Sequence, residues 1–456
     1  MFGQTWAHAR ALLWAAPLGA VLLGCGGGGD GGGGGSDTVV VTPVPVSNTA
    51  SYQQFVNTRA STITSLSEDR DFADLQPIGA AIGQRRIVQL GESSHGSGSM
   101  NKVKTRLIKY LHQQQGFNVI AFESSTFGCN LSLEAQSALT PSALMASCVF
   151  GVWHTREVEA LFSYIKQTQL SDRPLRLSGF DVQVSSANET AATLRVFFES
   201  HLDALQAQPR DAVIAAAVEA NRSQGDGRLC FTGADAACQR IRDAYASRVS
   251  ALDTAISIAQ AQSGKPGALA GLVLLSLRHA LDMNFADANK TSRMFETRDL
   301  GMARVLTGLA ERLFPEDKIM VWAHNAHIAE DYPQESLRNA NEAVMGMHLH
   351  QRWGDQLYTI GLYMVGGQQA DNNRAVTAVT PHKPDSLESL FAPLPHVASF
   401  LPLPKQDLAE PGDDWLHGLS IHKFWGRYEY RARLAQAYDA LLVIRESQAP
   451  VYIGGN

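Results

Sequence analysis

The chain has 456 residues, of which 45% are hydrophobic and 18% are charged, and this composition is enough to bury a large core. The net charge of -6 at pH 7, without any long basic run, argues against a nucleic-acid-binding surface. The length allows one large α/β domain with an insertion, or two domains.

The first residues are predicted to be a targeting segment and not part of the fold. Residues 11–23 form an apolar run that is too short to span a membrane, and this run ends in Leu22-Leu23-Gly24-Cys25. The ending resembles a bacterial lipobox, in which the cysteine is lipidated and becomes the new N-terminus. An ordinary secretory signal is the alternative. We therefore expect a signal peptide at 1–24 and a lipid on Cys25.

Residues 25–50 are expected to be a tether that holds the folded part, 51–456, away from a membrane. Residues 26–36 are nearly all glycine, and Pro43 and Pro45 stiffen the stretch that follows. The residue after Cys25 is Gly26 and not the aspartate that retains some lipoproteins at the inner membrane. The expected location is thus the cell envelope, at the outer membrane, facing the periplasm or the surface.

Four cysteines remain after Cys25, and an even number outside the cytoplasm indicates disulfides. Pairing neighbours in the sequence predicts the bridges Cys129–Cys148 and Cys230–Cys238. Free buried thiols are the alternative. The spacing of these cysteines matches no zinc site.

Short apolar runs rich in Val, Ile, Leu, Phe or Trp are predicted to be buried strands. They lie at residues 86–90, 118–123, 175–180, 318–322 and 357–362. Helical patterns separate them, among them 99–115, which ends at Gly116, and 155–167. This alternation predicts an α/β fold with a mostly parallel central sheet flanked by helices.

A large helical insertion, at about 186–313, is expected between the third and fourth strands. Its helical patterns lie at 189–208, 210–221, 236–262, 267–287 and 291–313. The part after Val365 is weakly patterned and rich in proline. Its aromatic residues either line a pocket or cap the core, and they include Trp415, Phe424, Trp425 and Tyr428.

Histidines and carboxylates stand at the ends of four predicted strands. The set comprises Glu92, His95, Glu123, Asp181, His324 and His327. The carboxyl ends of parallel strands meet at one edge of a sheet, where ligands bind in open α/β folds, so we expect these residues to converge. A single histidine is more often structural, but this many polar residues at strand ends is not expected of core filler.

These residue types suit the activation of water. A histidine accepts a proton near neutrality, and a carboxylate orients it. A second histidine can donate to a developing oxyanion. The sequence has no G-x-S-x-G, no Walker lysine and no H-E-x-x-H. A zinc or manganese site built from the same glutamates and histidines stays open as an alternative.

Ordered blocks of the sequence resemble the erythromycin esterase family over residues 85 to 365. The blocks are Leu90-Gly91-Glu92-Ser93-Ser94-His95-Gly96 with Lys104 and Arg106 after it, Ala121-Phe122-Glu123, Trp153-His154-Thr155-Arg156-Glu157, Gly179-Phe180-Asp181-Val182-Gln183, Thr297-Arg298-Asp299, Val321-Trp322-Ala323-His324-Asn325-Ala326-His327 and Met345-Gly346-Met347-His348-Leu349. Ser99 stands where family members often carry an acidic residue.

The resemblance implies a hydrolase that cleaves a carboxylic ester or lactone without a cofactor or metal. Macrolides, and with them antibiotic resistance, are one candidate among such esters. The implied general base is His95, and the implied catalytic network around it is Glu92, Glu123, His324 and His327. The residues expected to bind substrate are Lys104, Trp153, Asp181 and Arg298. Two other functions stay open: a metal-dependent hydrolase or peptidase using the same pocket, and a non-catalytic ligand-binding lipoprotein.

Overall fold

The computed structural model describes residues 49–134, 138–183, 189–202, 204–205, 207–222, 236–285, 291–331, 343–405 and 411–454. The predicted lipobox, the predicted tether up to residue 48 and Cys230 lie outside these residues, whereas Thr49 and Ala50, assigned to the tether, begin the first helix. None of the described helices is both long enough and apolar enough to cross a membrane.

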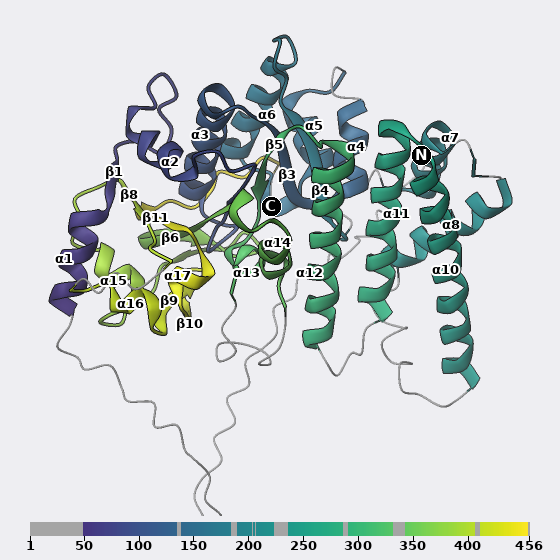
Figure 1. The fold of residues 1–456 in the computed structure, drawn as a ribbon. Helices are drawn as coiled ribbons and strands as arrows, with labels where there is room; N and C mark the ends of the chain where they lie inside the picture. Colours follow the sequence, from purple (N-terminus) through teal and green to yellow (C-terminus); the bar gives the residue numbers. More distant parts are fainter. Residues whose placement is uncertain are drawn as a thin grey trace, which may run out of the picture. The chain divides into compact units, whose positions relative to one another are not determined.

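A central sheet organises the fold (Figure 1). Its order is β1-β8-β11-β6-β2-β5-β3-β4, with β7 paired to the end of β6. The strands from β11 to β4 are parallel, whereas β8 is antiparallel to both of its neighbours. The strands of this sheet are β1 (Ser61–Ile63), β2 (Ile87–Leu90), β3 (Phe117–Ser125), β4 (Arg176–Asp181), β5 (Lys318–Trp322), β6 (Leu357–Ala370), β7 (Val376–Ala378), β8 (Ala398–Pro402) and β11 (Ala440–Ser447). The predicted fold class is confirmed.

The five predicted strands correspond to β2 through β6. The sequence prediction missed β11, which lies inside the sheet between β8 and β6. Its run of apolar residues, Leu441 to Ile444, fits a buried helix as well as a strand. A hairpin, β9 (Ser420–Phe424) and β10 (Tyr428–Ala432), forms a second sheet.

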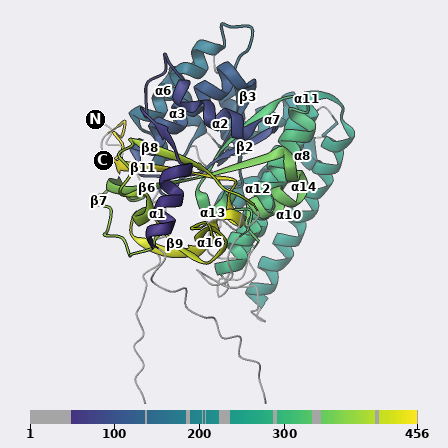
Figure 2. The same ribbon diagram turned by 60° about the vertical axis from the view of Figure 1, so that its left-hand side comes forward.

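Helices cover both faces of the sheet, as Figure 2 shows for α3 and α6 on one side and α12 and α14 on the other. The helices before the insertion are α1 (Thr49–Arg59), α2 (Gln76–Ile82), α3 (Gly98–Gln115), α4 (Thr126–Glu134), α5 (Pro141–Cys148) and α6 (Arg156–Thr168). Those after β5 are α13 (Asn325–Ile328), α14 (Met345–Trp353), α15 (Leu387–Phe391), α16 (Asp414–His417) and α17 (Leu434–Ala437). Short turns of other helix types lie at Ala73–Leu75, Gly151–Trp153, Leu309–Leu313 and Gly354–Gln356.

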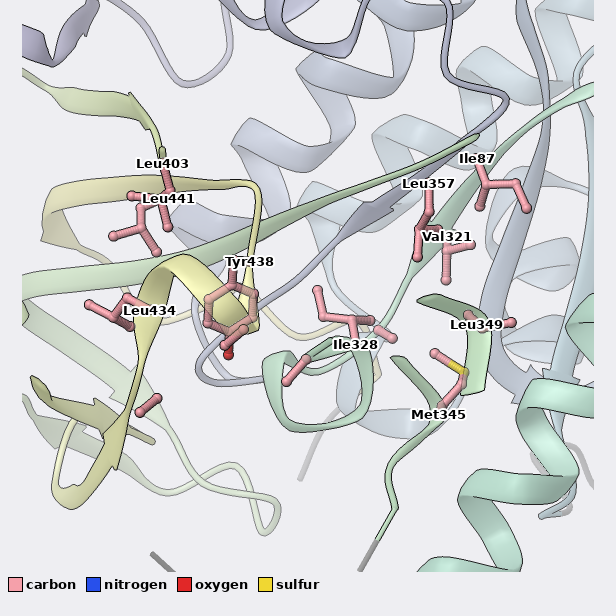
Figure 3. Close-up of a cluster of buried hydrophobic side chains, with 14 of the residues drawn as sticks. Ile87, Val321, Ile328, Met345, Leu349, Leu357, Leu403, Leu434, Tyr438 and Leu441 are labelled. Atoms are coloured by element: carbon pink, nitrogen blue, oxygen red, sulfur yellow. The ribbon is translucent and has the colours of Figure 1, made fainter. Parts of the chain in front are cut away.

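The period-2 geometry of the strands produces two cores. In β5, Ile319 and Val321 pack into one core, while Met320 and Trp322 pack into the other. Figure 3 shows part of the first core, where Val321 lies near Leu349 of α14. Burial on both faces explains why these strands are apolar throughout.

The helices α7 (Ala191–His201), α8 (Ala207–Arg222), α10 (Ala236–Ala261), α11 (Gly264–Phe285) and α12 (Thr291–Gly308) follow β4 and precede β5. Most of them share a core of their own, with Phe198, Val213 and Leu252 at its centre. Met302 and Leu306 of α12 pack instead into a core of the central sheet. The inserted helices therefore reach the sheet through α12 and also through α11, whose Leu272 packs into the same core and whose Ser276 Oγ donates to the Asp181 carbonyl of β4.

The predicted bridge Cys129–Cys148 is present and joins α4 to α5. Cys238 also forms a disulfide, but its predicted partner Cys230 lies outside the described residues.

Candidate active site

His95 lies on the loop between β2 and α3, and its ring is held by Glu92. His95 Nδ1 is 2.5 Å from Glu92 Oε1. The side chain of Glu92 is fully buried, whereas 15% of the His95 side chain is exposed. Since a carboxylate accepts, Nδ1 carries the proton. The other nitrogen, Nε2, makes no hydrogen bond within the described part of the chain and is left with its lone pair, as a general base requires.

Close backbone packing fixes the position of this loop. A Cβ at Gly96 would lie 1.8 Å from the carbonyl oxygen of Ala370, so only glycine fits there. The Ala370 N–H donates to the Gly96 carbonyl over 2.8 Å. Ser97 then caps α3 by accepting from the Met100 N–H over 3.1 Å. The predicted start of this helix is therefore confirmed to within one residue.

The segment after β11 holds the same loop from another side. The Gly98 N–H donates to the Gln448 carbonyl over 2.8 Å, and Ser97 Oγ lies 2.8 Å from Ser447 Oγ. Ser99, where the family pattern often has an acidic residue, is buried and accepts from the Gln448 N–H over 2.9 Å. The loop is thus bound to two segments far away in the sequence.

Lys104 and Trp153, which were expected to bind substrate, both contact Glu92. Lys104 Nζ lies 2.5 Å from Glu92 Oε2, and Trp153 Nε1 donates to Glu92 Oε1 over 3.1 Å. Both residues are buried, and the Lys104 ammonium lies 3.8 Å from the centre of the Trp322 ring. Burial lowers the pKa of Lys104 to about 8, although the charge of Glu92 opposes this. Lys104 and Trp153 therefore hold the Glu92 carboxylate in the position from which it contacts His95.

Glu123 is the centre of a second charged cluster. Arg298 Nη2 donates to Glu123 Oε1 over 2.9 Å, and the His324 N–H donates to Oε2 over 2.8 Å. Burial alone would raise the pKa of Glu123, but the positive charges of His327 and Arg298 outweigh it and hold that pKa well below its usual range. Glu123 is therefore a carboxylate at neutral pH.

Arg298 of α12 is engaged by carboxylates and lies close to His327. It contacts Asp181 twice, with Nε 3.1 Å from Oδ1 and Nη2 2.5 Å from Oδ2. Both side chains are buried, and Arg298 Nη1 lies 3.0 Å from His327 Nε2. Arg298 and Asp181, also expected to bind substrate, are thus placed in a structural ion pair beside Glu123.

His327 lies between two carboxylates. Its Nδ1 is 2.8 Å from Asp299 Oδ1, and its Nε2 is 3.3 Å from Glu123 Oε1. Burial would lower the pKa of His327, but the charges of Asp299 and Glu123 outweigh it and raise that pKa. Asp299 was not among the predicted site residues, although it stands directly after Arg298 in the sequence.

His324 differs from His327, because its surroundings favour the neutral ring. It caps α13, and its Nδ1 accepts from the Ala326 N–H over 3.1 Å. Nδ1 therefore has no proton, and the neutral ring carries its proton on Nε2. Burial, together with the charge of protonated His95, holds the pKa of His324 well below its usual range. The Nε2 atom is buried and makes no hydrogen bond of good geometry to a described residue, although the Ser93 carbonyl lies near enough to oppose the lowering of this pKa.

Aromatic rings surround His95. Ring centres lie 4.9 Å away for Trp153, 5.0 Å for Trp425 and 5.1 Å for His324. Trp425, in the turn between β9 and β10, reaches the site because its N–H donates to the Ser93 carbonyl over 2.7 Å. The sequence left the role of Trp425 open between pocket and core, and no pattern around it predicts that it contacts His95.

The donor groups do not fit a metal centre. Glu92 Oε2 contacts the Lys104 ammonium and Glu123 Oε1 contacts the Arg298 guanidinium, so a cation of the protein already lies beside each carboxylate where a metal ion would bind. In the described ranges, no three His, Cys, Asp or Glu residues come together in a group that could hold a metal ion.

Known proteins resemble this chain along most of its length. A sequence model described as erythromycin esterase matches residues 112–447, a range that contains Glu123 and His324 but begins after His95. The chain is 28% identical over 405 residues to "Putative hydrolase YbfO" of Bacillus subtilis (strain 168), which covers 83% of this chain and 88% of that protein.

Solved structures show the same fold. A succinoglycan biosynthesis protein aligns with a TM-score of 0.74 and 17% identity, over 90% of this chain and 100% of that one. A mutant of the erythromycin esterase EreC in its open conformation aligns with a TM-score of 0.62 and 15% identity, over 87% of this chain and 100% of that one. A protein from Bacillus cereus aligns with a TM-score of 0.73 and 19% identity, over 89% of this chain and 100% of that one.

Proposed function

The chain belongs to the erythromycin esterase family of hydrolases, and from that premise we propose that it cleaves carboxylic esters or lactones with water activated by His95. The observation that carries this proposal is the His95–Glu92 pair. A buried carboxylate orients the ring, and the free nitrogen Nε2 belongs to the most exposed histidine of the cluster. Lys104 and Trp153 keep Glu92 in place, so the geometry exists before substrate binds.

In the proposed reaction, His95 Nε2 takes a proton from water as the water oxygen attacks the carbonyl carbon of the ester. Glu92 stabilises the imidazolium that forms. When the tetrahedral intermediate collapses, the bond from carbon to the alcohol oxygen breaks, and His95 returns its proton to that oxygen. The products are one carboxylic acid and one alcohol.

His324 is proposed to donate to the oxyanion. Its neutral ring presents Nε2–H, whereas the ring of His95 presents an unprotonated Nε2, so the two histidines have complementary tautomers. Nε2 of His324 is a buried donor without a well-formed bond, and a substrate oxygen would satisfy it. The neighbouring side chains must move for that oxygen to enter, and catalytic hydrogen bonds often become well aligned only in the complex with substrate.

The charged cluster is proposed to position His324. Glu123 binds the His324 N–H, and Arg298 and His327 fix the orientation of Glu123. Asp299 and Glu123 raise the pKa of His327, which lies beside His324 with ring centres 6.4 Å apart. Arg298 and Lys104 are therefore positioning residues in this proposal.

The test is hydrolysis of 4-nitrophenyl acetate and of a macrolide panel by wild type and His95→Asn, with and without a chelator. We expect kcat/KM of His95→Asn to fall by about 10²–10⁴-fold with an unchanged melting temperature. For His324→Phe, kcat/KM should fall by about 10²–10³-fold. The control is His112→Asn, because buried His112 contacts Tyr164 and the Arg173 carbonyl away from the site. It should lose stability and keep activity.

An active His95→Asn protein would contradict the assignment of the base. Loss of wild-type activity with the chelator would favour the metal-dependent alternative. Binding of esters by the wild type without turnover would favour a ligand-binding lipoprotein.

We also propose that the protein is held in the cell envelope by a lipid on Cys25. The sequence Leu22-Leu23-Gly24-Cys25 supports this proposal. The disulfide Cys129–Cys148 is in keeping with it, because such bridges persist in oxidising compartments.

A further inference from the structure

Trp425 has a backbone conformation that is unfavourable for its residue type. Its φ is +56°, in the left-handed region that glycine and asparagine adopt more easily. The conformation is held on one side by the hydrogen bond from the Trp425 N–H to the Ser93 carbonyl. On the other side, the Thr380 N–H donates to the Gly426 carbonyl over 2.8 Å. Any residue with an N–H could make the first bond, so the backbone contacts do not explain why a tryptophan is here.

The indole of Trp425 lies against both proposed catalytic histidines. It stacks on His324, with ring centres 5.6 Å apart and planes at 21°. It meets His95 edge to face, at 5.0 Å and 79°. We therefore expect a substrate carbonyl that reaches His324 Nε2, while water is held at His95 Nε2, to lie against this indole.

Trp425 is also the tryptophan beside His95 that has surface left for a substrate. Trp153 is 1% exposed and its N–H is bound to Glu92. Trp425 is only partly buried, and the N–H of its indole ring makes no hydrogen bond to a described side chain. The two rings next to the base thus differ in role, because one supports Glu92 and the other faces the approach to the site.

We propose that Trp425 is a specificity-determining residue that selects esters whose acyl group is flat and aromatic. The inference rests on the proposed ester hydrolysis. Aromatic rings prefer offset-stacked or edge-to-face contact, which a flat acyl group makes with an indole better than a puckered ring of the same size. The strained backbone conformation is retained because it brings the indole against His95 and His324.

The experiment compares 4-nitrophenyl benzoate with 4-nitrophenyl cyclohexanecarboxylate, which share a leaving group and differ in the flatness of the acyl ring. The measured quantity is the benzoate-to-cyclohexanecarboxylate ratio of kcat/KM. We expect Trp425→Leu and Trp425→Gly to lower this ratio by about 3- to 10-fold, the effect of one aromatic pair. Trp425→Phe should keep most of it. The change should lie mainly in KM, as expected for lost binding.

Asp385→Gly is the matched control, because Asp385 also has a positive φ, +64°, and lies outside the site. It relieves the backbone and removes only a hydrogen bond from Thr49, so it should leave the ratio unchanged. If wild type hydrolyses both esters but all Trp425 variants keep its ratio, the specificity role is wrong and ester hydrolysis stands. A lower melting temperature with an unchanged ratio would likewise overturn the proposal. If wild type hydrolyses neither of these two esters but cleaves 4-nitrophenyl acetate or a macrolide, the specificity proposal fails alone; if it cleaves none of them, the proposed ester hydrolysis fails too.

Discussion

Lys104→Met removes the buried ammonium next to Glu92 and keeps most of the length and apolar volume of the side chain. In the structure Lys104 Nζ lies 2.5 Å from Glu92 Oε2, and both side chains are fully buried. Without Lys104, the Glu92 carboxylate keeps two donors, His95 Nδ1 and Trp153 Nε1, but no opposite charge. The variant therefore isolates the electrostatic support of the proposed base.

The expected cost is large because only one partner of a buried pair is removed. Such changes cost about 3–5 kcal/mol of stability. Lys109 offers a control on the same helix, since it pairs at 2.6 Å with an Asp69 side chain that is 46% exposed. Lys109→Met should cost about 0–1 kcal/mol. Misplacement of His95 should also lower kcat/KM of Lys104→Met by about 10²-fold.

The pH dependence of stability gives a second readout. Burial brings the pKa of Lys104 from 10.5 to about 8 in the folded protein. Between these values the unfolded chain binds more protons, so the contribution of Lys104 makes stability rise with pH. Lys104→Met should lack this rise.

The assays are urea unfolding at several pH values and hydrolysis of 4-nitrophenyl acetate. The double variant Lys104→Met/Glu92→Gln should recover stability relative to Lys104→Met, because no buried charge is left unpaired, yet stay inactive. The reasoning is refuted if Lys104→Met is as stable as Lys109→Met. It is also refuted if Lys104→Met has wild-type kcat/KM.

Three further results are expected. His327 has a raised pKa in the folded protein. Its stabilising effect is therefore present below its unfolded pKa of about 6.5 and is lost as the pH rises through the folded pKa. His327→Gln should flatten this part of the pH–stability curve, and an unchanged curve would contradict the shift. Replacing Cys129 and Cys148 by alanine opens a loop with a sequence separation of 19. This should lower the free energy of unfolding by about 3 kcal/mol and the melting temperature by a few degrees. A melting temperature equal to that of wild type would show that the bridge does not stabilise the fold. Cys25→Ser should abolish palmitate labelling, and labelling equal to wild type would rule out the lipobox.

The fold could be predicted best where short apolar runs alternate with helical patterns along the chain. Short apolar runs between amphipathic helices have one common solution, a parallel sheet covered on both faces. The carboxyl ends of such strands share an edge, so Glu92, His95, Glu123 and His324 could be expected to meet. Their side chains do converge in the structure, through His95–His324 ring contact and the Glu123–His324 hydrogen bond.

Features that depend on distant partners could not be predicted. The apolar run of β11 becomes a strand because it pairs with β6 and β8. Trp425 enters the site through one hydrogen bond to Ser93 and leaves no sequence pattern. Charged residues such as Lys104 and Arg298 suggested contact with substrate, because a sequence does not show which carboxylates will bury them.

The attachment of the His95 loop to the segment after β11 has a consequence for folding kinetics. Ser97 and Ser447, which are hydrogen-bonded, are separated by 350 positions in the sequence. Contacts across so long a separation require the closure of a very large chain loop and are slow to form. Helices such as α3 depend on near neighbours and can form early. We therefore expect the proposed base to reach its working geometry at a late step of folding, after most of the sheet beneath it has assembled.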